Sequence, residues 1–257
     1  MSIQEINVLH YNAGYKSPNW VSLILHPIFS YDQQSKAKRN FREIKKHIAL
    51  QNKKMTNIQF LDYGYGLGSL LLKMRKSKIL EGIEISDVAQ NNLKSICSIL
   101  NIRMSLFNYL EGVSSPTAVN YDVISCSHVL EHLEEEVELL EVFHNRLTKD
   151  GILLLNLPIN EIWEDPKHVR KYDRASVEML LKNTGFYINK VVECDRLTAF
   201  ILNKKLLNRS IIKNFVLKAI SATLAILPVS SWNAIEKALP KSYMNQQLIV
   251  IASKRIF

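Results

Sequence analysis

The stretch "LDYGYGLGS", residues 61–69, places glycine at every second position, 64, 66 and 68, directly behind Asp62. Glycine adopts backbone conformations that are closed to other residues and lets the backbone approach a ligand. An apolar run, Ile58–Asp62, precedes the glycines, and Leu67–Lys76 follows with apolar residues at helical spacing. The pattern predicts a buried strand, a tight turn and a helix, with a ligand bound at the carboxyl end of the strand.

The alternation of short apolar runs with helical stretches continues along the chain. It indicates a doubly wound α/β fold, in which a mostly parallel sheet carries helices on both faces. Strands are expected at Ile58–Asp62, Ile79–Ile85, Ile102–Phe107, Tyr121–Cys126, Ile152–Leu157, Tyr187–Cys194 and Gln247–Ser253. Helices are expected at Leu67–Lys76, Asp87–Leu100 and Glu131–Leu147.

The pattern divides the chain into an N-terminal lid and helix, residues 1–50, and a main domain, residues 51–257. Lys36–Leu50 has the spacing of a basic amphipathic helix. Residues 1–33 are expected to be irregular, and they carry the aromatic residues Tyr11, Tyr15, Trp20 and Tyr31. This segment either folds over the site as a lid, with Tyr31 as a candidate substrate-binding residue, or packs on the outer edge of the sheet.

A helical insertion is expected at about residues 197–245, before the last strand. Its stretch "SIIKNFVLKAISATLAILPV", residues 210–229, places apolar residues on one helical face and polar ones on the other. This is the pattern of an amphipathic helix, not of a membrane span. Its apolar face packs on the parent domain or on a second copy in a homodimer; the alternative is contact with an anionic membrane through residues 205–228.

Composition narrows the possible partners and the compartment. The 257 residues contain 33 Lys and Arg against 24 Asp and Glu, so the formal net charge of +9 favours an anionic partner. Cys97, Cys126 and Cys194 lie far apart in sequence and suggest neither a disulfide framework nor a thiolate zinc site. With no basic segment leading into an apolar run at the N-terminus, we expect no signal peptide and a cytoplasmic protein.

Two carboxylates indicate which ligand the glycine turn binds. Glu84 ends the next expected strand, about twenty residues on, where a carboxylate accepts hydrogen bonds from ribose hydroxyls. A dinucleotide fingerprint starting at Gly64 would place glycine at position 69, but Ser69 stands there. Asp62 would repel a pyrophosphate and suits the cationic amino group of a methionine moiety, which favours S-adenosylmethionine over NAD.

At these residues the chain resembles the class I S-adenosylmethionine-dependent methyltransferases, in their small-molecule O-methyltransferase branch. The resemblance rests on residues 62–68, on "YDVISCSHVLEHL" (121–133), "LTKDGILLLNLPIN" (147–160) and "HVRKYDRASVEMLLKNTGF" (168–186). It implies a Rossmann-like sheet of seven strands with an antiparallel last strand. It also implies a set of cofactor-binding residues, namely Asp62, Gly64, Tyr65, Gly66, Gly68, Glu84, Ile85, Asn108 and Ser127.

The sequence departs from that family at two of these positions. Tyr65 stands where a small residue is common, which is a matter of packing. Asn108 stands where many relatives carry an aspartate for the adenine amino group, and its side-chain oxygen can accept the same hydrogen bond.

The candidates for catalysis cluster in "SHVLEH", residues 127–132. A helix beginning at His128 would bring His128, Glu131 and His132 to one face. We interpret His128 as the general base or acceptor-positioning residue, with Glu131, His132 and the downstream His168 beside it. The alternative is a divalent metal held by all four, which resembles the metal site of small-RNA 2′-O-methyltransferases. Arg170, in the loop after the fifth strand, is a candidate partner for an anionic substrate group.

These patterns predict O-methylation of a hydroxyl on a small anionic acceptor, such as a nucleotide-linked or surface-polysaccharide sugar of a bacterium. Three alternatives stay open: a membrane-associated O-methyltransferase of quinone or lipid metabolism, a cofactor-binding protein without catalytic activity, and an RNA methyltransferase. A nucleic acid is disfavoured because the basic residues are dispersed and not interleaved with aromatic ones.

Overall fold

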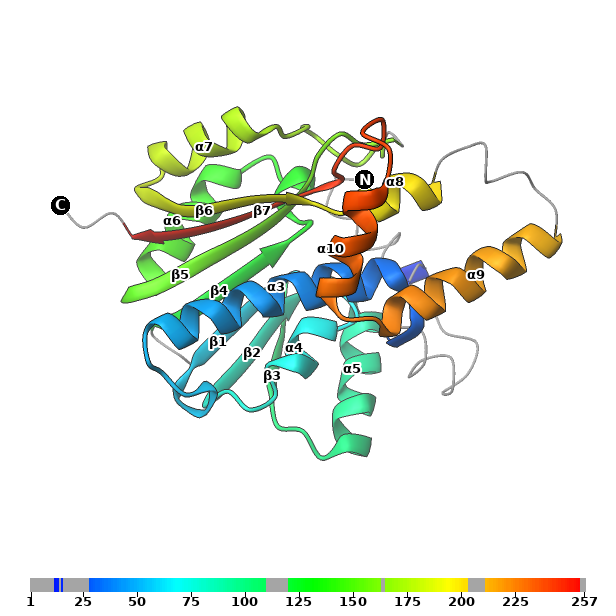
Figure 1. Ribbon diagram of the computed structural model, residues 1–257. Helices are drawn as coiled ribbons and strands as arrows, with labels where there is room; N and C mark the ends of the chain where they lie inside the picture. Colours follow the sequence, from blue (N-terminus) through cyan, green and yellow to red (C-terminus); the bar gives the residue numbers. More distant parts are fainter. Residues whose placement is uncertain are drawn as a thin grey trace.

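The computed structural model describes residues 12, 13, 15, 28–109, 120–162, 165–202 and 211–254, without the side chains of residues 202, 211–215 and 217. Its centre is a seven-stranded sheet in the order β3-β2-β1-β4-β5-β7-β6 (Figure 1). The strands are β1 Gln59–Tyr63, β2 Ile79–Glu84, β3 Ser105–Asn108, β4 Tyr121–Ser127, β5 Leu147–Pro158, β6 Phe186–Cys194 and β7 Gln247–Lys254.

The strand pairing confirms the doubly wound α/β fold that the sequence predicts. β1 pairs in parallel with β2 and with β4, and β4 pairs in parallel with β5. β7 is antiparallel to both β5 and β6. Because the carboxyl ends of the parallel strands meet at one edge, the turn after β1 lies between the ends of β2 and β4, where ligands bind in such sheets.

Helices cover both faces of the sheet (Figure 1). One core cluster joins the sheet to α6 (Glu136–Arg146) and α7 (Arg174–Asn183). The other joins the opposite face to α3 (Tyr31–Leu50), α4 (Ser69–Lys73) and α5 (Asp87–Leu100). The sandwich buries the sheet on both sides, which explains why its strands read as continuous apolar runs.

Three expected helix bounds were wrong. α3 begins at Tyr31 and not at Lys36, and α4 is a short helix that ends at Lys73. The segment expected to be helical from Glu131 instead forms a 3-10 turn, η3 (Leu130–His132), and α6 begins only at Glu136. Residues 133–135 separate the two, and the buried apolar face of α6 begins at Leu139.

The region between β6 and β7 is helical, as predicted. It contains α8 (Arg196–Leu202), α9 (Ile211–Ile226) and α10 (Val229–Ala238). Trp232 of α10 is fully buried, donates from Nε1 to the Leu224 carbonyl over 2.8 Å, and meets Tyr31 edge-on at 5.3 Å between ring centroids. The C-terminal part of α9 therefore packs on the domain.

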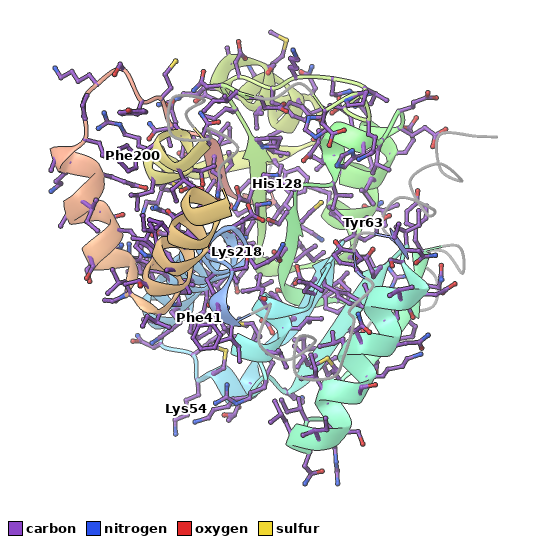
Figure 2. All side chains as sticks on the ribbon, turned by 90° about the vertical axis from the view of Figure 1, so that its right-hand side faces the viewer. Phe41, Lys54, Tyr63, His128, Phe200 and Lys218 are labelled. Atoms are coloured by element: carbon purple, nitrogen blue, oxygen red, sulfur yellow. The ribbon has the colours of Figure 1, made fainter. Side chains whose placement is uncertain are left out.

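The middle of α9 is less covered. Val216 and Ile220 are 49% and 41% exposed, and Lys218 is exposed beside them. Figure 1 shows α9 extending away from the sheet, and Figure 2 labels Lys218 on it. No helix in the described part of the chain is both long and apolar enough to span a membrane.

A buried ion pair links α3 to α10 of this helical region. Arg39 Nη2 lies 2.6 Å from Glu236 Oε1 of α10, and both side chains are nearly inaccessible to water. Breaking such a pair leaves one charge buried without compensation, which is strongly destabilising. α3 and α10 consequently hold a fixed relative position, which matters because α3 also forms a wall of the site.

Candidate functional site

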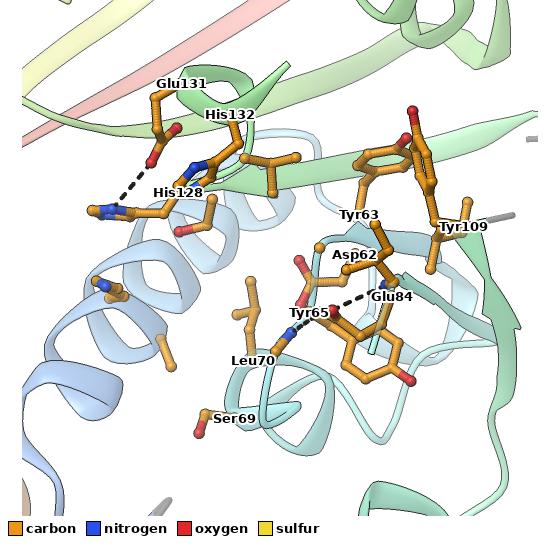
Figure 3. Close-up of a pocket in the computed structure, with 18 of the residues that line it drawn as sticks. Asp62, Tyr63, Tyr65, Ser69, Leu70, Glu84, Tyr109, His128, Glu131 and His132 are labelled. Carbon is orange, nitrogen blue, oxygen red and sulfur yellow. Dashed lines mark hydrogen bonds and ion pairs between the residues drawn. The ribbon is translucent and has the colours of Figure 1, made fainter. Parts of the chain in front are cut away.

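A cavity of about 380 Å³ opens at the carboxyl edge of the sheet, between the ends of β1, β2 and β4 and the N-terminal half of α3. This volume is in the range of small-molecule and cofactor sites. Figure 2 views the molecule with His128, at the end of β4, near the middle, and Figure 3 shows the side chains that line the cavity.

The glycine turn forms the floor of this cavity. Gly64, Gly66 and Gly68 all have positive φ angles, of 73°, 54° and 73°. A Cβ on Gly64 would lie 2.2 Å from Val129 Cγ2, and one on Gly68 would lie 2.5 Å from Leu93 Cδ2. The spacing of the glycines is thus explained by left-handed backbone at alternate residues and by close contact with the turn after β4 and with α5.

Glu84 holds the glycine turn from the neighbouring strand. Its Oε2 accepts from the Gly66 N–H over 2.7 Å, and its Oε1 accepts from the N–H groups of Ile85 and Ser86 over 3.0 and 3.1 Å. The residue is 5% exposed, and burial raises the pKa of Glu84 against the lowering effect of these three donors. A carboxylate accepts about four hydrogen bonds, so capacity remains for a ligand hydroxyl.

Asp62 lies beside it at the end of β1 (Figure 3). Only 3% of the residue is exposed, and burial raises the pKa of Asp62 to about 7, with the nearby Glu84 adding to the shift. A buried acid of this kind loses its proton readily when a cation binds next to it. Asp62 can therefore become negatively charged when a cation binds in the cavity. It stands at the position that the sequence assigns to the ammonium group of the cofactor.

Most of the residues proposed for the cofactor line the cavity. They are Asp62, Gly64, Tyr65, Gly66, Glu84, Ile85 and Ser127. Gly68 lies behind the turn against Leu93, and Asn108 lies outside the cavity lining, where its Nδ2 donates to Asp87 over 2.8 Å. The structure therefore uses Asn108 to tie the end of β3 to the start of α5.

The turn after β4 begins with a left-handed residue, His128. His128 has a φ angle of 54°, uncommon for a residue with a side chain, and its N–H donates to the Asn156 carbonyl over 2.8 Å. His128 Nδ1 lies 3.5 Å from Glu131 Oε1, and a dashed line marks this pair in Figure 3. Burial lowers the pKa of His128 well below its ordinary value, so the ring is neutral at pH 7.

His128, Glu131, His132 and His168 all line the cavity. One ligand atom of each of Glu131, His132 and His168 lies within 4.8 Å of the others. Because His128 is left-handed and η3 follows it, they converge through a 3-10 turn and not through the α-helical face that the sequence predicts. The His168 N–H donates to the Asp165 carbonyl, and the Val169 N–H to that of Glu131, which brings the later loop to the turn.

Two proposed substrate contacts lie elsewhere. Arg170 does not line the cavity; its Nη1 lies 2.7 Å from Glu136 Oε2, and its Nη2 donates to the Glu134 carbonyl over 2.9 Å. The Tyr31 side chain is buried against Trp232, and its hydroxyl donates to Asp195 Oδ1 over 2.7 Å. In the described structure these two residues fasten a loop and a helix, respectively.

Other lining residues went unnoticed in the sequence. Lys36 and Asn40 line the cavity from α3 at i, i+4 spacing, and Tyr109 lines it after β3. Tyr15 also lines it, and this residue belongs to the segment 1–33 that the sequence offered as a possible lid. The i, i+4 spacing of Lys36 and Asn40 can be seen in the sequence. Because the helix was expected to begin only at Lys36, we did not expect α3 to form a wall of the site. Tyr109 follows the end of β3 and meets Tyr63 at 6.0 Å between ring centroids, a contact that sequence does not show.

A second, smaller cavity of about 150 Å³ shares Lys36 and His128 with the first. It extends away from the glycine turn toward Glu161, Asp195 and Gln247. Lys36 Nζ lies 3.2 Å from Asp32 Oδ1, and 27% of the Lys36 side chain is exposed. The two cavities together place a cation and an imidazole between a cofactor-sized space and an adjoining one.

Comparison with known proteins agrees with this geometry. A family model described as "Methyltransferase domain" matches residues 34–191, which is more than half of the chain. None of the curated proteins with which the sequence was compared matches it significantly.

Among solved structures, magnesium protoporphyrin IX methyltransferase from Synechocystis PCC 6803, with bound SAM, has a TM-score of 0.56 at 13% identity, covering 99% of this chain and 98% of that one. A methyltransferase from Clostridium acetobutylicum ATCC 824 also scores 0.56, at 11% identity and coverages of 85% and 92%. The cyclase SpnF scores 0.55, at 17% identity and coverages of 83% and 81%. At these identities the likeness shows the fold.

Proposed function

The chain belongs to this family and is an S-adenosylmethionine-dependent methyltransferase, and from that premise we propose that it methylates a hydroxyl group on a small anionic acceptor. The observation that carries the proposal is the pair of adjoining cavities that meet at His128 and Lys36. The larger has the carboxylates and glycine turn that suit the cofactor, and the smaller has room for an acceptor group.

The cofactor half is supported by the position of its two carboxylates. Asp62 faces the place for the ammonium group of the methionine moiety, and Glu84 faces the place for the ribose hydroxyls. Between them the left-handed glycines leave backbone without side chains. With the cofactor held in this way, its methyl group would point toward the end of β4, where Ser127 and His128 line the cavity. The adenine would then lie toward Ile85 and Tyr109.

The acceptor half is supported by one cation, which is paired with Asp32 and stands among the carboxylates of Asp32, Glu161 and Asp195, and by proton-accepting capacity. Lys36 is the cation that lines both cavities, and it replaces Arg170 as the proposed partner of an anionic acceptor group. The neutral imidazole of His128 lies at the junction and is the proposed base. Positioning the acceptor oxygen in line with the sulfonium methyl supplies much of the acceleration in such a reaction.

The proposed step is a displacement at carbon. The acceptor oxygen forms a bond to the methyl carbon while the bond from that carbon to sulfur breaks, and its electron pair stays on sulfur. The hydroxyl proton passes to His128 and then to solvent. The products are a methyl ether and S-adenosylhomocysteine.

A nucleotide-linked or surface-polysaccharide sugar is the proposed acceptor class, because it combines hydroxyls with a phosphate or carboxylate for Lys36. The test incubates the purified protein with methyl-labelled S-adenosylmethionine and a panel of nucleotide sugars, with uncharged sugars as matched controls. Mass spectrometry should show a labelled methyl ether on an anionic member. Transfer to nitrogen or carbon acceptors alone would contradict the proposal.

A membrane-associated O-methyltransferase of quinone or lipid metabolism is a second candidate, favoured by the exposed Val216 and Ile220 beside Lys218 on α9. It predicts that the protein co-sediments with anionic vesicles and that Val216→Ser with Ile220→Ser abolishes this. The alternative for the same face is a second copy of the chain, which would appear as a dimer in light scattering and be lost in that double variant.

The match to a methyltransferase family model disfavours the alternative of a cofactor-binding protein without catalytic activity. That alternative would bind S-adenosylmethionine and give no labelled product on any acceptor. The buried thiols of Cys97, Cys126 and Cys194, all unpaired with one another, are consistent with a reducing compartment, and we propose the cytoplasm.

A further inference from the structure

Three potential metal ligands from two segments meet on the cavity wall opposite the glycine turn. Glu131 and His132 come from η3, and His168 comes from the loop after β5. We propose that these three side chains bind a divalent transition-metal ion, and that the ion coordinates the acceptor hydroxyl. The second part of this inference rests on the proposed function, whereas the metal site itself does not.

The first observation is the state of Glu131. The residue is completely buried, and neither carboxylate oxygen has a hydrogen-bond partner in another described residue. Glu131 Oε1 lies 3.5 Å from His128 Nδ1, which is beyond ordinary hydrogen-bond distance. A buried carboxylate without partners is costly, and native structures pair such groups or place them on a metal. A cation bound here would supply the missing partner.

The second observation is the orientation of the two histidines. His132 Nδ1 lies 3.3 Å from the Lys167 carbonyl oxygen, and His168 Nδ1 lies 3.0 Å from Glu161 Oε1. A neutral ring that donates from Nδ1 carries its lone pair on Nε2. Metal-binding histidines are characteristically held in this way, by a carbonyl or a carboxylate on the other ring nitrogen. The two rings stand 4.8 Å apart between centroids.

The donor set indicates the kind of metal. Two imidazole nitrogens and one carboxylate suit zinc, manganese or ferrous iron, whereas magnesium and calcium prefer oxygen ligands. Three protein ligands also leave a coordination position open for a substrate oxygen. Within the described part of the chain, this is the one group of three such side chains close enough to share an ion.

The proposed metal site faces the same cavity as the proposed base. The three ligands line the larger cavity together with His128, which the structure leaves outside the group. An oxygen on the open position would thus lie in the same cavity as the proposed base. Coordination lowers the pKa of a bound hydroxyl or water, so metal and base would act on the same proton.

The test uses the full chain, stripped with a chelator and titrated with Co²⁺ while the visible absorption of the ion is recorded. Wild type should bind a single saturating equivalent. Glu131→Gln and His168→Gln should weaken binding at least tenfold, and Glu161→Gln, which changes only the residue behind His168, about tenfold. His144→Gln is the matched control, since His144 packs on Phe186 away from the cavity. S-adenosylmethionine affinity monitors folding in each variant.

The outcomes separate the two proposals. Absence of saturable Co²⁺ binding, or equal binding by wild type and the Glu131 and His168 variants, overturns the metal site even if hydroxyl methylation is found. Co²⁺ binding as expected without any hydroxyl methylation leaves the metal site standing and overturns the proposed function. If methylation occurs and is unchanged by chelation, the ion's role toward the acceptor is overturned.

Discussion

Lowering the pH should weaken S-adenosylmethionine binding through Asp62. In the free protein, burial raises the pKa of Asp62 to about 7. The proposed ammonium partner favours the ionised form, so the pKa falls when the cofactor binds. Binding below the free-protein pKa therefore releases a proton from Asp62, and affinity must fall as pH decreases.

The magnitude follows from the fraction of Asp62 that is ionised. With a pKa of about 7, roughly half of the molecules are ready to bind at pH 7, and roughly one in thirty at pH 5.5. The dissociation constant should therefore rise roughly 15-fold over this interval, about 1.6 kcal/mol. The cofactor amino group stays protonated in this window, because α-amino groups titrate near pH 8.

Calorimetry across this pH range measures the effect, with Asp62→Asn as the matched variant. The amide keeps the shape of the side chain but has no proton to lose, so the variant should bind more weakly at pH 7 and lose most of the pH dependence. Equal slopes in wild type and Asp62→Asn would refute the reasoning, because the titrating group would then lie elsewhere.

Three further substitutions separate the roles of neighbouring residues. Glu84→Gln replaces a carboxylate that accepts from three N–H groups with an amide whose NH₂ opposes a donor, so calorimetry should show at least about tenfold weaker cofactor binding; unchanged affinity would contradict this. His128→Asn tolerates the left-handed backbone but removes the base, so kcat should fall about 100-fold or more while cofactor affinity holds; full turnover would exclude His128 as the base. Lys36→Met should raise KM for an anionic acceptor about 10- to 100-fold, whereas Lys45→Met, on the exposed side of the same helix, should leave it unchanged; equal KM values in both would remove Lys36 from the acceptor site.

The sequence predicts the sheet well because its strands are buried on both faces. Continuous apolar runs predicted all seven strands. The predicted start of β5 was wrong by five residues, because "LTKD" at 147–150 is more polar than a typical buried strand. Helix starts were less predictable. Ser30 at the N-cap and Asp32 in the first turn are ordinary start signals for α3, but they stand about five residues before the basic amphipathic stretch from which the helix was predicted.

The site was predictable where one short segment forms it and less so where distant segments meet. Asp62, Gly64 and Gly66 come from a single turn, and Glu84 follows at a regular interval, so sequence places them together. Lys36 reaches the cavity through the packing of α3, which depends on the insertion almost 200 residues later, Glu236 lying 197 positions after Arg39. No spacing rule connects such residues.

The Arg39–Glu236 pair has a consequence for how acceptor preference changes among related enzymes. The proposed cofactor site is built from strand ends, whereas one wall of the proposed acceptor site belongs to α3, whose position is fixed by its contact with α10. Exchanging the α8–α10 region together with α3 between relatives should therefore transfer the preference for one acceptor over another. The affinity for S-adenosylmethionine should stay unchanged.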